Sequence, residues 1–142
     1  MALAEVREIS TDQEIAATFG VMKQLRSHLV EEKYLEMVRW MQKDGYRLAV
    51  LVEGEKVRSV AGFRISEYLH RSRHLYVDDL VTDESVRSKG YGKLLFDWLL
   101  EEARKNGCEQ FHLDSGVQRY EAHKFYFREN LKITAYHFSM EL

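Results

Sequence analysis

Hydrophobic and polar positions divide the first third of the chain into one alternating run and two helical runs. Leu3 to Ile9 alternates in the way typical of a half-buried strand. Residues 10–12 supply helix-capping side chains, and Glu14 stands where a capping box needs it, so a helix is predicted from there to about His28. Apolar residues that recur near helical period predict a second helix from about Glu31 to Lys43.

The middle of the chain has the alternation and the turn residues of a hairpin followed by a further strand. Gly45 ends the second helix. Tyr46 to Val52 and Val57 to Tyr68 are predicted strands, joined by the short glycine-containing turn 53–56. Leu75 to Thr82 is the next predicted strand.

The last third returns to helical periodicity. An apolar helical face begins after Gly92 and is terminated by residues 106–107. Glu109 to Asp114 is a predicted strand, about Arg119 to Glu129 a helix, and Lys132 to Met140 a final strand. The predicted order is βααβββαβαβ, an α/β protein with a mixed sheet flanked by helices.

Length and composition fit one folded domain. The 142 residues include 45% hydrophobic and 31% charged residues, and no linker, repeat or low-complexity segment divides them. A chain of this size buries about two-thirds of its unfolded surface, which is enough for an independent core. We therefore expect a single domain over residues 1–142.

Charge and cysteine content exclude several classes of function. A net charge of -2 argues against general nucleic-acid binding, which usually goes with a basic domain. The single Cys108 cannot form an internal disulfide and is expected in the core. We expect no membrane interaction and a cytoplasmic location, because neither a signal-peptide pattern nor a membrane-spanning apolar stretch is present. The six histidines show no His-x-x-x-His or Glu-x-x-His spacing on one helix face, so no metal is expected.

The strongest functional signal is a glycine-containing run between a predicted strand and a predicted helix. Its residues are Arg87, Ser88, Lys89, Gly90, Tyr91 and Gly92. Two glycines there let backbone N–H groups crowd around a ligand, and a helix N-terminus favours a phosphate. An ATPase phosphate loop is excluded because Lys93 precedes Leu94, and a dinucleotide fingerprint is excluded because Leu95 replaces the third glycine.

A second motif follows about one βα unit later. It consists of Ala122-His123-Lys124-Phe125-Tyr126, followed by Asn130-Leu131. With the Arg-x-x-Gly-x-Gly run, this pattern resembles the GNAT superfamily of N-acetyltransferases over roughly Leu75 to Leu131. Asn130 stands where glycine is usual, and asparagine tolerates the left-handed conformation of a helix C-cap.

The resemblance implies a GNAT-like fold and an acetyl-CoA:amine N-acetyltransferase that works by direct attack in a ternary complex, without a metal. In the family, backbone groups near the end of the strand that corresponds to Leu75–Thr82 bind the pantetheine arm. By position these are Leu80, Val81 and Thr82. The residues matched to pyrophosphate binding are Arg87, Ser88, Lys89, Gly90, Tyr91, Gly92 and Lys93. Tyr126 takes the position of the general acid beside the sulfur, although it could instead be one of three packed aromatic residues.

The sequence gives weaker signals for the proton acceptor of the amine than for the binding of acetyl-CoA. An alkylamine is mostly protonated at neutral pH, so a carboxylate or a water chain should remove a proton. Asp78 and Asp79 are the best carboxylates, and neighbouring strand residues face opposite sides, so only one is expected to face a given pocket. We favour Asp79 because it precedes the cofactor-facing segment. The alternative is that both aspartates cap a strand bulge or pair with arginines such as Arg71 and Arg73.

The partner predicted by the resemblance is a small-molecule or peptide amine, in a pocket covered by the early helices. Residues such as His28, Tyr34 and Trp40 would line that pocket. Only about a dozen residues follow the last helix, enough for one strand where the family often has two, so the choice between a monomer and a homodimer stays open. A catalytically silent acyl-CoA-binding or sensing module is the alternative function, and a scaffold domain whose glycines only shape a turn is a third.

Overall fold

The computed structural model describes residues 3–142 of the chain, and the chain divides into two compact units, Met1–His112 and Leu113–Leu142. The first unit holds most of the helices and strands. The second holds one helix and is too short to build a core of its own. No helix within residues 3–142 has the length and apolar character needed to span a membrane.

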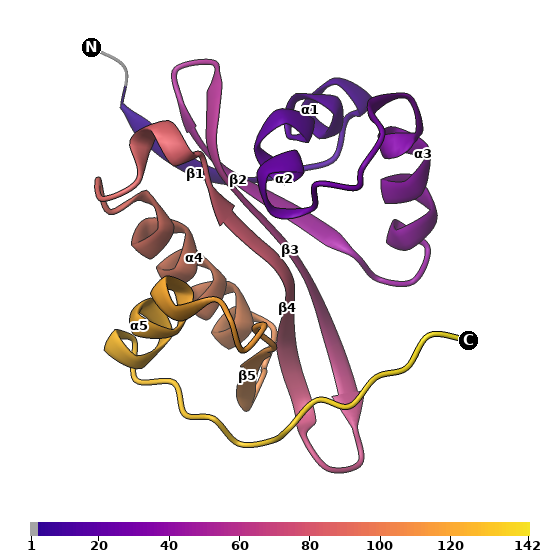
Figure 1. Ribbon diagram of the computed structural model, residues 1–142, viewed down its shortest axis with the longest axis vertical. Helices are drawn as coiled ribbons and strands as arrows, with labels where there is room; N and C mark the ends of the chain where they lie inside the picture. The colour runs from indigo at the N-terminus through magenta and orange to yellow at the C-terminus, as the bar shows by residue number, and fades with distance from the viewer. Residues whose placement is uncertain (1–2) are drawn as a thin grey trace. The chain divides into compact units, whose positions relative to one another are not determined.

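A five-stranded sheet forms the centre of the first unit (Figure 1). In spatial order its strands are β1 (Ala4–Ile9), β2 (Arg47–Glu53), β3 (Lys56–Tyr68), β4 (Ser72–Thr82) and β5 (Gln110–Leu113). β1 to β4 pair antiparallel. β5 neighbours β4 but is reached through a crossover helix, the connection that parallel strands require, so the sheet is mixed.

Helices cover both faces of this sheet. They are α1 (Asp12–Ala17), α2 (Phe19–Leu25), α3 (Glu31–Gln42) and α4 (Tyr91–Lys105), and a 3-10 turn η1 (Glu84–Val86) follows β4. The helix of the second unit is α5 (Tyr120–Arg128). α2 contacts β3 and β4, whereas α4 crosses β1 to β4. Because β2 lies between the two helical layers, its residues 48–52 are all buried and form a continuous apolar run.

The mixed sheet flanked by helices is confirmed, together with several local predictions. Thr11 and Glu14 form the reciprocal capping box at the start of α1. Gly54 adopts a left-handed conformation in the β2–β3 turn. Asn130 has φ of +67°, and the N–H of Leu131 bonds the carbonyl of Tyr126, so asparagine does close α5 as a left-handed cap.

Two predicted elements differ in the structure. The first predicted helix is two helices, divided at Thr18, whose hydroxyl bonds the Ile15 carbonyl at 2.7 Å and the Tyr34 hydroxyl at 2.6 Å. Bonding back to its own preceding turn competes with the regular helical ladder and ends α1. The final strand predicted at 132–140 is also wrong, because those residues form neither helix nor strand. Alternation alone does not make a strand without a hydrogen-bonding neighbour.

Candidate active site

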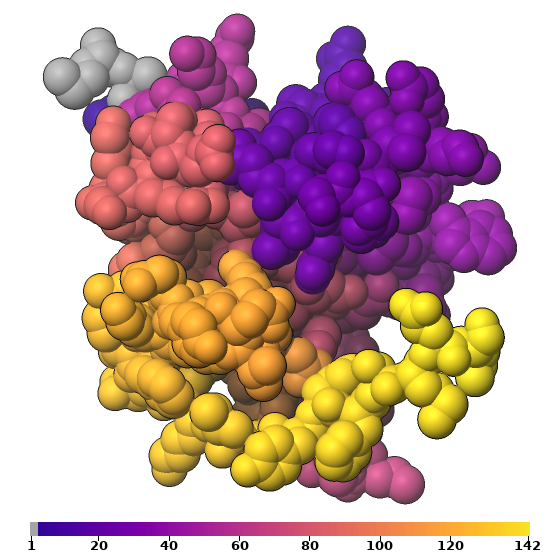
Figure 2. Space-filling view, viewed as in Figure 1, coloured from indigo at the N-terminus to yellow at the C-terminus, as the bar shows by residue number. Residues whose placement is uncertain are grey.

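The segment that follows β4 is anchored at several points before it reaches α4. The N–H of Asp83 bonds the Arg58 carbonyl at 2.7 Å, and the Asp83 carboxylate accepts from the N–H of Ser85 at 3.2 Å. Gln24 of α2 bonds both Asp83 and the N–H of Glu84. Figure 2 shows this segment, coloured salmon, at the surface against the indigo α1–α2 region. The turn is therefore held in place before the glycine run begins.

Left-handed residues shape the glycine run itself. Ser88 has φ of +74° and Gly90 has φ of +81°, and Gly90 is the N-cap of the 15-residue α4. Glycine has no side chain to cap the helix, and within the described chain no acidic residue lies in the first turn of α4. The N–H groups and positive dipole end of α4 are thus uncompensated by acidic side chains of that turn, as a phosphate site requires.

Gly92 allows α4 to approach the end of β4 closely. A Cβ at Gly92 would lie 3.3 Å from the Thr82 hydroxyl, which in turn bonds the Ser59 hydroxyl at 2.8 Å. Tyr91, between the glycines, donates to Glu53 at 2.5 Å. That bond raises the pKa of Tyr91 and is the main cause that lowers the pKa of Glu53, with Arg58 contributing. The β2–β3 turn therefore holds the helix start.

The three basic side chains predicted to bind phosphate differ in exposure and in ion pairing. Arg87 and Lys89 are exposed on the turn together with Ser88. Lys93 is instead paired with Asp97 at 2.8 Å, one turn along α4. The structure thus leaves the basic side chains of the glycine run exposed but directs the neighbouring Lys93 along the helix.

A bulge interrupts β4 just before the predicted pantetheine segment. Gly62 of β3 pairs with Asp79 and Phe63 pairs with Val77, which leaves Asp78 as the extra residue in the β3–β4 ladder. We call residues 77–79 the β4 bulge. Beyond it, Leu80 and Val81 pair regularly with β3.

The expectation that Asp78 and Asp79 face opposite sides is wrong because of this bulge. Asp79 accepts a hydrogen bond from the Tyr46 hydroxyl at 2.7 Å. Asp78 accepts one from Arg64 at 3.0 Å, and the Arg64 guanidinium lies over the ring of Tyr46, 5.4 Å from its centroid. Both carboxylates therefore lie around Tyr46, since the extra residue resets the alternation of β4.

Ion pairs hold both carboxylates, but not with the arginines that the sequence suggested. Arg26, at the C-terminus of α2, donates to Asp79 Oδ1 at 2.9 Å and to the Asp78 carbonyl at 2.9 Å. Arg71 lies over the ring of Tyr68, and Arg73 pairs with Glu67. Both aspartates therefore do pair with arginines, but with Arg26 and Arg64 and not with Arg71 and Arg73.

Burial changes the acid–base properties of the residues around the bulge. It raises the pKa of the Asp78 carboxyl, against the lowering effect of Arg64. It also raises the pKa of Tyr46, and the negative charge of Asp79 raises it further. Tyr46 is therefore a protonated hydrogen-bond donor at every physiological pH.

Tyr126 lies in α5, in the second unit. Its ring contacts Phe125 edge to face at 5.7 Å between centroids. Burial raises the pKa of its hydroxyl, while the charge of Arg119 lowers it. The net result is a phenol that stays protonated at neutral pH and can act as a donor.

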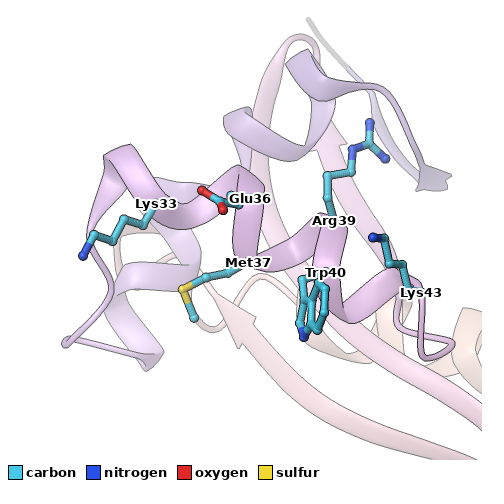
Figure 3. A pocket seen from close by; sticks show the side chains of 6 residues that line it. All are labelled: Lys33, Glu36, Met37, Arg39, Trp40 and Lys43. Carbon is cyan, nitrogen blue, oxygen red and sulfur yellow. The ribbon is translucent and has the colours of Figure 1, made fainter.

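The three residues suggested for an acceptor pocket do not converge. Tyr34 is 4% exposed in the core, whereas Trp40 is 72% exposed on the other side of α3. Trp40 lines a groove of about 600 Å³ on that outer face (Figure 3). The groove is lined by Lys33, Glu36, Met37, Arg39, Trp40 and Lys43. His28 is exposed in the loop before α3. A shared pocket for these residues is therefore wrong.

Sequence reasoning missed Arg26, Tyr46 and Arg64, the side chains that hold the two aspartates. Tyr46 fits a buried strand pattern, and neither arginine belongs to a motif. One signal was present: Gly62 lies inside a predicted strand, where glycine often marks a bulge or a close approach. Within the described residues, no group of three or more His, Cys, Asp or Glu side chains is arranged to hold a metal.

Comparison with known proteins agrees with this geometry. The profile of the acetyltransferase (GNAT) family matches residues 5–130. An uncharacterized N-acetyltransferase of Bacillus subtilis is 37% identical over 125 residues, which cover 87% of this chain and 88% of that protein. The aminoalkylphosphonate N-acetyltransferase of Salmonella typhimurium is 34% identical over 98 residues, covering 68% of this chain and 62% of that enzyme.

A solved aminoglycoside N-acetyltransferase in complex with CoA has the same fold. It aligns with a TM-score of 0.85 over 100% of this chain and 96% of its own, at 15% identity. That likeness concerns the fold, whereas the family profile and the Bacillus relative extend over most of the sequence. On these grounds the chain belongs to the acetyltransferase (GNAT) family.

Proposed function

We propose that this chain is an N-acetyltransferase that moves the acetyl group of acetyl-CoA to a primary amine by direct attack in a ternary complex. The observation that carries the proposal is the left-handed turn at Ser88 and Gly90, which opens the 15-residue α4 after the bulged strand β4 and the 3-10 turn η1. Family membership makes acetyl-CoA the donor for this arrangement.

The first turn of α4 would hold the diphosphate of the donor. Backbone N–H groups from Ser88 to Lys93 supply the hydrogen bonds, and Arg87 and Lys89 supply positive charge. Tyr91 and Gly92 set the position of the turn through Glu53 and Thr82. Lys93 has to leave Asp97 before it can reach a phosphate.

The pantetheine arm would run beside Leu80, Val81 and Thr82. These residues pair with β3 on one side. On the other side, β5 is only four residues long, and the N–H of Glu109 just before it bonds the carbonyl of Arg73, near the start of β4. Four residues of strand rise about 13 Å, too little to run beside all of β4. The far end of β4 is then available to the arm.

The reaction needs a proton acceptor and a proton donor. In the proposal, the Asp79 carboxylate receives the proton of the attacking amine, and a backbone N–H at the β4 bulge polarises the thioester carbonyl. The nitrogen lone pair forms the C–N bond, and the C–S bond breaks. The sulfur then takes the phenolic proton of Tyr126, and coenzyme A leaves as the thiol. The family motif assigns this role to Tyr126, and its raised pKa keeps the proton in place.

A catalytically silent acyl-CoA-binding module is the second candidate. It is favoured by one observation: both oxygens of Asp79 accept bonds from Arg26 and Tyr46, and Asp78 is paired with Arg64. Each of these bonds occupies a lone pair that a base would otherwise use to take a proton from the amine.

A thiol-release assay with a panel of amines distinguishes the candidates. The panel includes aminoalkylphosphonates, because the Salmonella relative is named for them, together with aminoglycosides, amino sugars, polyamines, amino acids and lysine peptides. We expect at least one amine to release thiol, and Tyr126→Phe to lower kcat by about 100-fold or more with unchanged acetyl-CoA affinity. Tight binding of acetyl-CoA without thiol from any amine would establish the silent module. If calorimetry detects no binding of acetyl-CoA, only the third alternative remains, a scaffold domain whose glycines shape a turn.

A further inference from the structure

Tyr46 makes an unusual connection between two strands. It precedes β2 directly, is 4% exposed, and its hydroxyl reaches Asp79 Oδ2 on β4 at 2.7 Å. β2 and β4 are not neighbours in the sheet, because β3 lies between them. The side chain therefore crosses β3 to reach the carboxylate.

Gly62 of β3 is what allows this crossing. A Cβ built on Gly62 would lie 1.9 Å from the Tyr46 hydroxyl oxygen and 2.4 Å from the ring carbon that carries it. Gly62 is also the residue that pairs with Asp79 at the bulge. Any larger residue at position 62 would displace the tyrosine from the carboxylate.

Two donors from different parts of the chain fix the Asp79 carboxylate. Tyr46 donates to Oδ2, and Arg26 donates to Oδ1 while also bonding the Asp78 carbonyl of the bulge. The Asp79 side chain is 12% exposed, so water competes little for these bonds. With both oxygens held, the carboxylate has one orientation, and each oxygen keeps a further lone pair for a substrate N–H.

Tyr46 cannot itself serve as the base. Burial and the charge of Asp79 raise its pKa, which keeps the proton on its oxygen. Its ring is additionally covered by the Arg64 guanidinium, which holds Asp78. The tyrosine is thus a fixed donor between the two aspartates of the bulge.

We infer that Tyr46 is a positioning residue for the acetyl transfer: its hydroxyl, admitted by the missing side chain of Gly62, holds the Asp79 carboxylate in the orientation that receives the amine proton. The inference rests on the proposed function, in which Asp79 is the proton acceptor. Positioning of this kind affects the chemical step, since a small misplacement of a reacting group is costly while donor binding elsewhere is unaffected.

The test is a double-mutant cycle between Tyr46 and Asp79, with kcat and KM measured by thiol release. Tyr46→Phe should lower kcat by about 10- to 100-fold and leave KM for acetyl-CoA within about twofold. In the Asp79→Asn background, Tyr46→Phe should have no further effect, because the tyrosine acts through that carboxylate.

The matched control is Tyr34→Phe. Tyr34 is equally buried, and the charge of Asp79 contributes to raising its pKa, but its hydroxyl bonds Thr18 and not the carboxylate. Thr18 keeps its own bond to the Ile15 carbonyl when the Tyr34 hydroxyl is removed. We expect kcat to stay within about twofold of the parent. Arg26→Gln provides a second variant at a partly exposed position if Tyr46→Phe fails to fold, and it should show the same dependence on Asp79.

The outcomes separate this inference from the proposed function. Losses of kcat that add independently, or an equal loss in Tyr34→Phe, would overturn the role of Tyr46 while the enzyme stays an acetyltransferase. Absence of thiol release from the parent would contradict the proposed function. In that case a crystal structure of Tyr46→Phe decides the inference: a reoriented Asp79 side chain supports it, and an unchanged one refutes it.

Discussion

The glycine turn before α4 and the β4 bulge lie at opposite ends of one short stretch of chain, and they are built in different ways. The turn is exposed, and its ligand-binding groups are backbone N–H groups arranged by the left-handed residues Ser88 and Gly90. The bulge is largely buried, and its carboxylates are placed by Arg26 at the end of α2, Tyr46 just before β2 and Arg64 of β3.

This difference decides how each region tolerates substitution. A backbone site depends on conformations that only a few residue types adopt, so its glycines matter more than its charged residues. A side-chain site depends on several distant residues filling one space, so a single added methyl can displace the whole arrangement. The following variants test that contrast, beginning with the largest expected effect.

Gly62→Ala should damage both stability and activity. The new Cβ would collide with Tyr46, and overpacking of this kind costs about 1–3 kcal/mol. We expect a kcat loss at least as large as that of Tyr46→Phe. Chemical denaturation and thiol release measure the two effects. Gly20→Ala is the control, because a Cβ there meets nothing within 4 Å and should slightly stabilise α2. Full activity in Gly62→Ala would contradict the crossing of Tyr46 over β3.

Gly90→Val should weaken acetyl-CoA binding by about tenfold or more, because a β-branched residue at φ of +81° is strained by about 1–2 kcal/mol and shifts the turn. Calorimetry gives the dissociation constant. Gly45→Val is matched to it: Gly45 has φ of +92° and equally open space, but it lies in the turn between α3 and β2, far along the chain from the glycine turn. Similar stability losses with a binding defect only at position 90 would support the turn as the anion site. Unchanged affinity in Gly90→Val would refute it.

Arg87→Gln and Lys89→Gln should each raise the dissociation constant for acetyl-CoA by about three- to tenfold at low salt, because they remove charge beside the diphosphate. The difference from the parent should shrink as salt is raised, since both side chains are exposed. Arg104→Gln, near the other end of α4, should leave affinity unchanged. Equal effects at positions 87 and 104 would indicate a general charge effect instead of a phosphate site.

Tyr91→Phe should have the smallest effect, a modest loss of melting temperature that depends on pH. The Tyr91 bond lowers the pKa of Glu53 below its usual value, so its contribution is present above the unfolded pKa of 4.5 and is lost as pH falls through the folded value. Parent and variant should thus differ at pH 7 and converge as the pH is lowered below 4.5 in thermal unfolding. A constant difference across this range would show that the bond to Glu53 is not its source.

The predictions from sequence succeeded where structure is local. The capping box at Thr11 and Glu14, the β2–β3 turn and the left-handed Asn130 each depend on residues close in the chain. The division of the first helix at Thr18 was missed because a threonine inside a helical pattern does not show whether its hydroxyl bonds a carbonyl of the preceding turn. That hydroxyl also bonds Tyr34, 16 residues away. The absent final strand was missed because alternation predicts which side chains could share a face, not whether a neighbouring strand is present.

The amino-acid sequence by itself determined the mixed sheet flanked by helices and the place of the glycine turn, because helix periodicity, strand alternation and glycine spacing are properties of neighbouring residues. The family followed from the resemblance of two short motifs to those of known proteins. Only the tertiary structure decided that Asp78 and Asp79 face the same side and that Arg26, Tyr46 and Arg64 hold them. The reason is physical: a bulge changes the alternation of a strand by one residue, and the partners of a buried carboxylate are chosen by packing across the sheet.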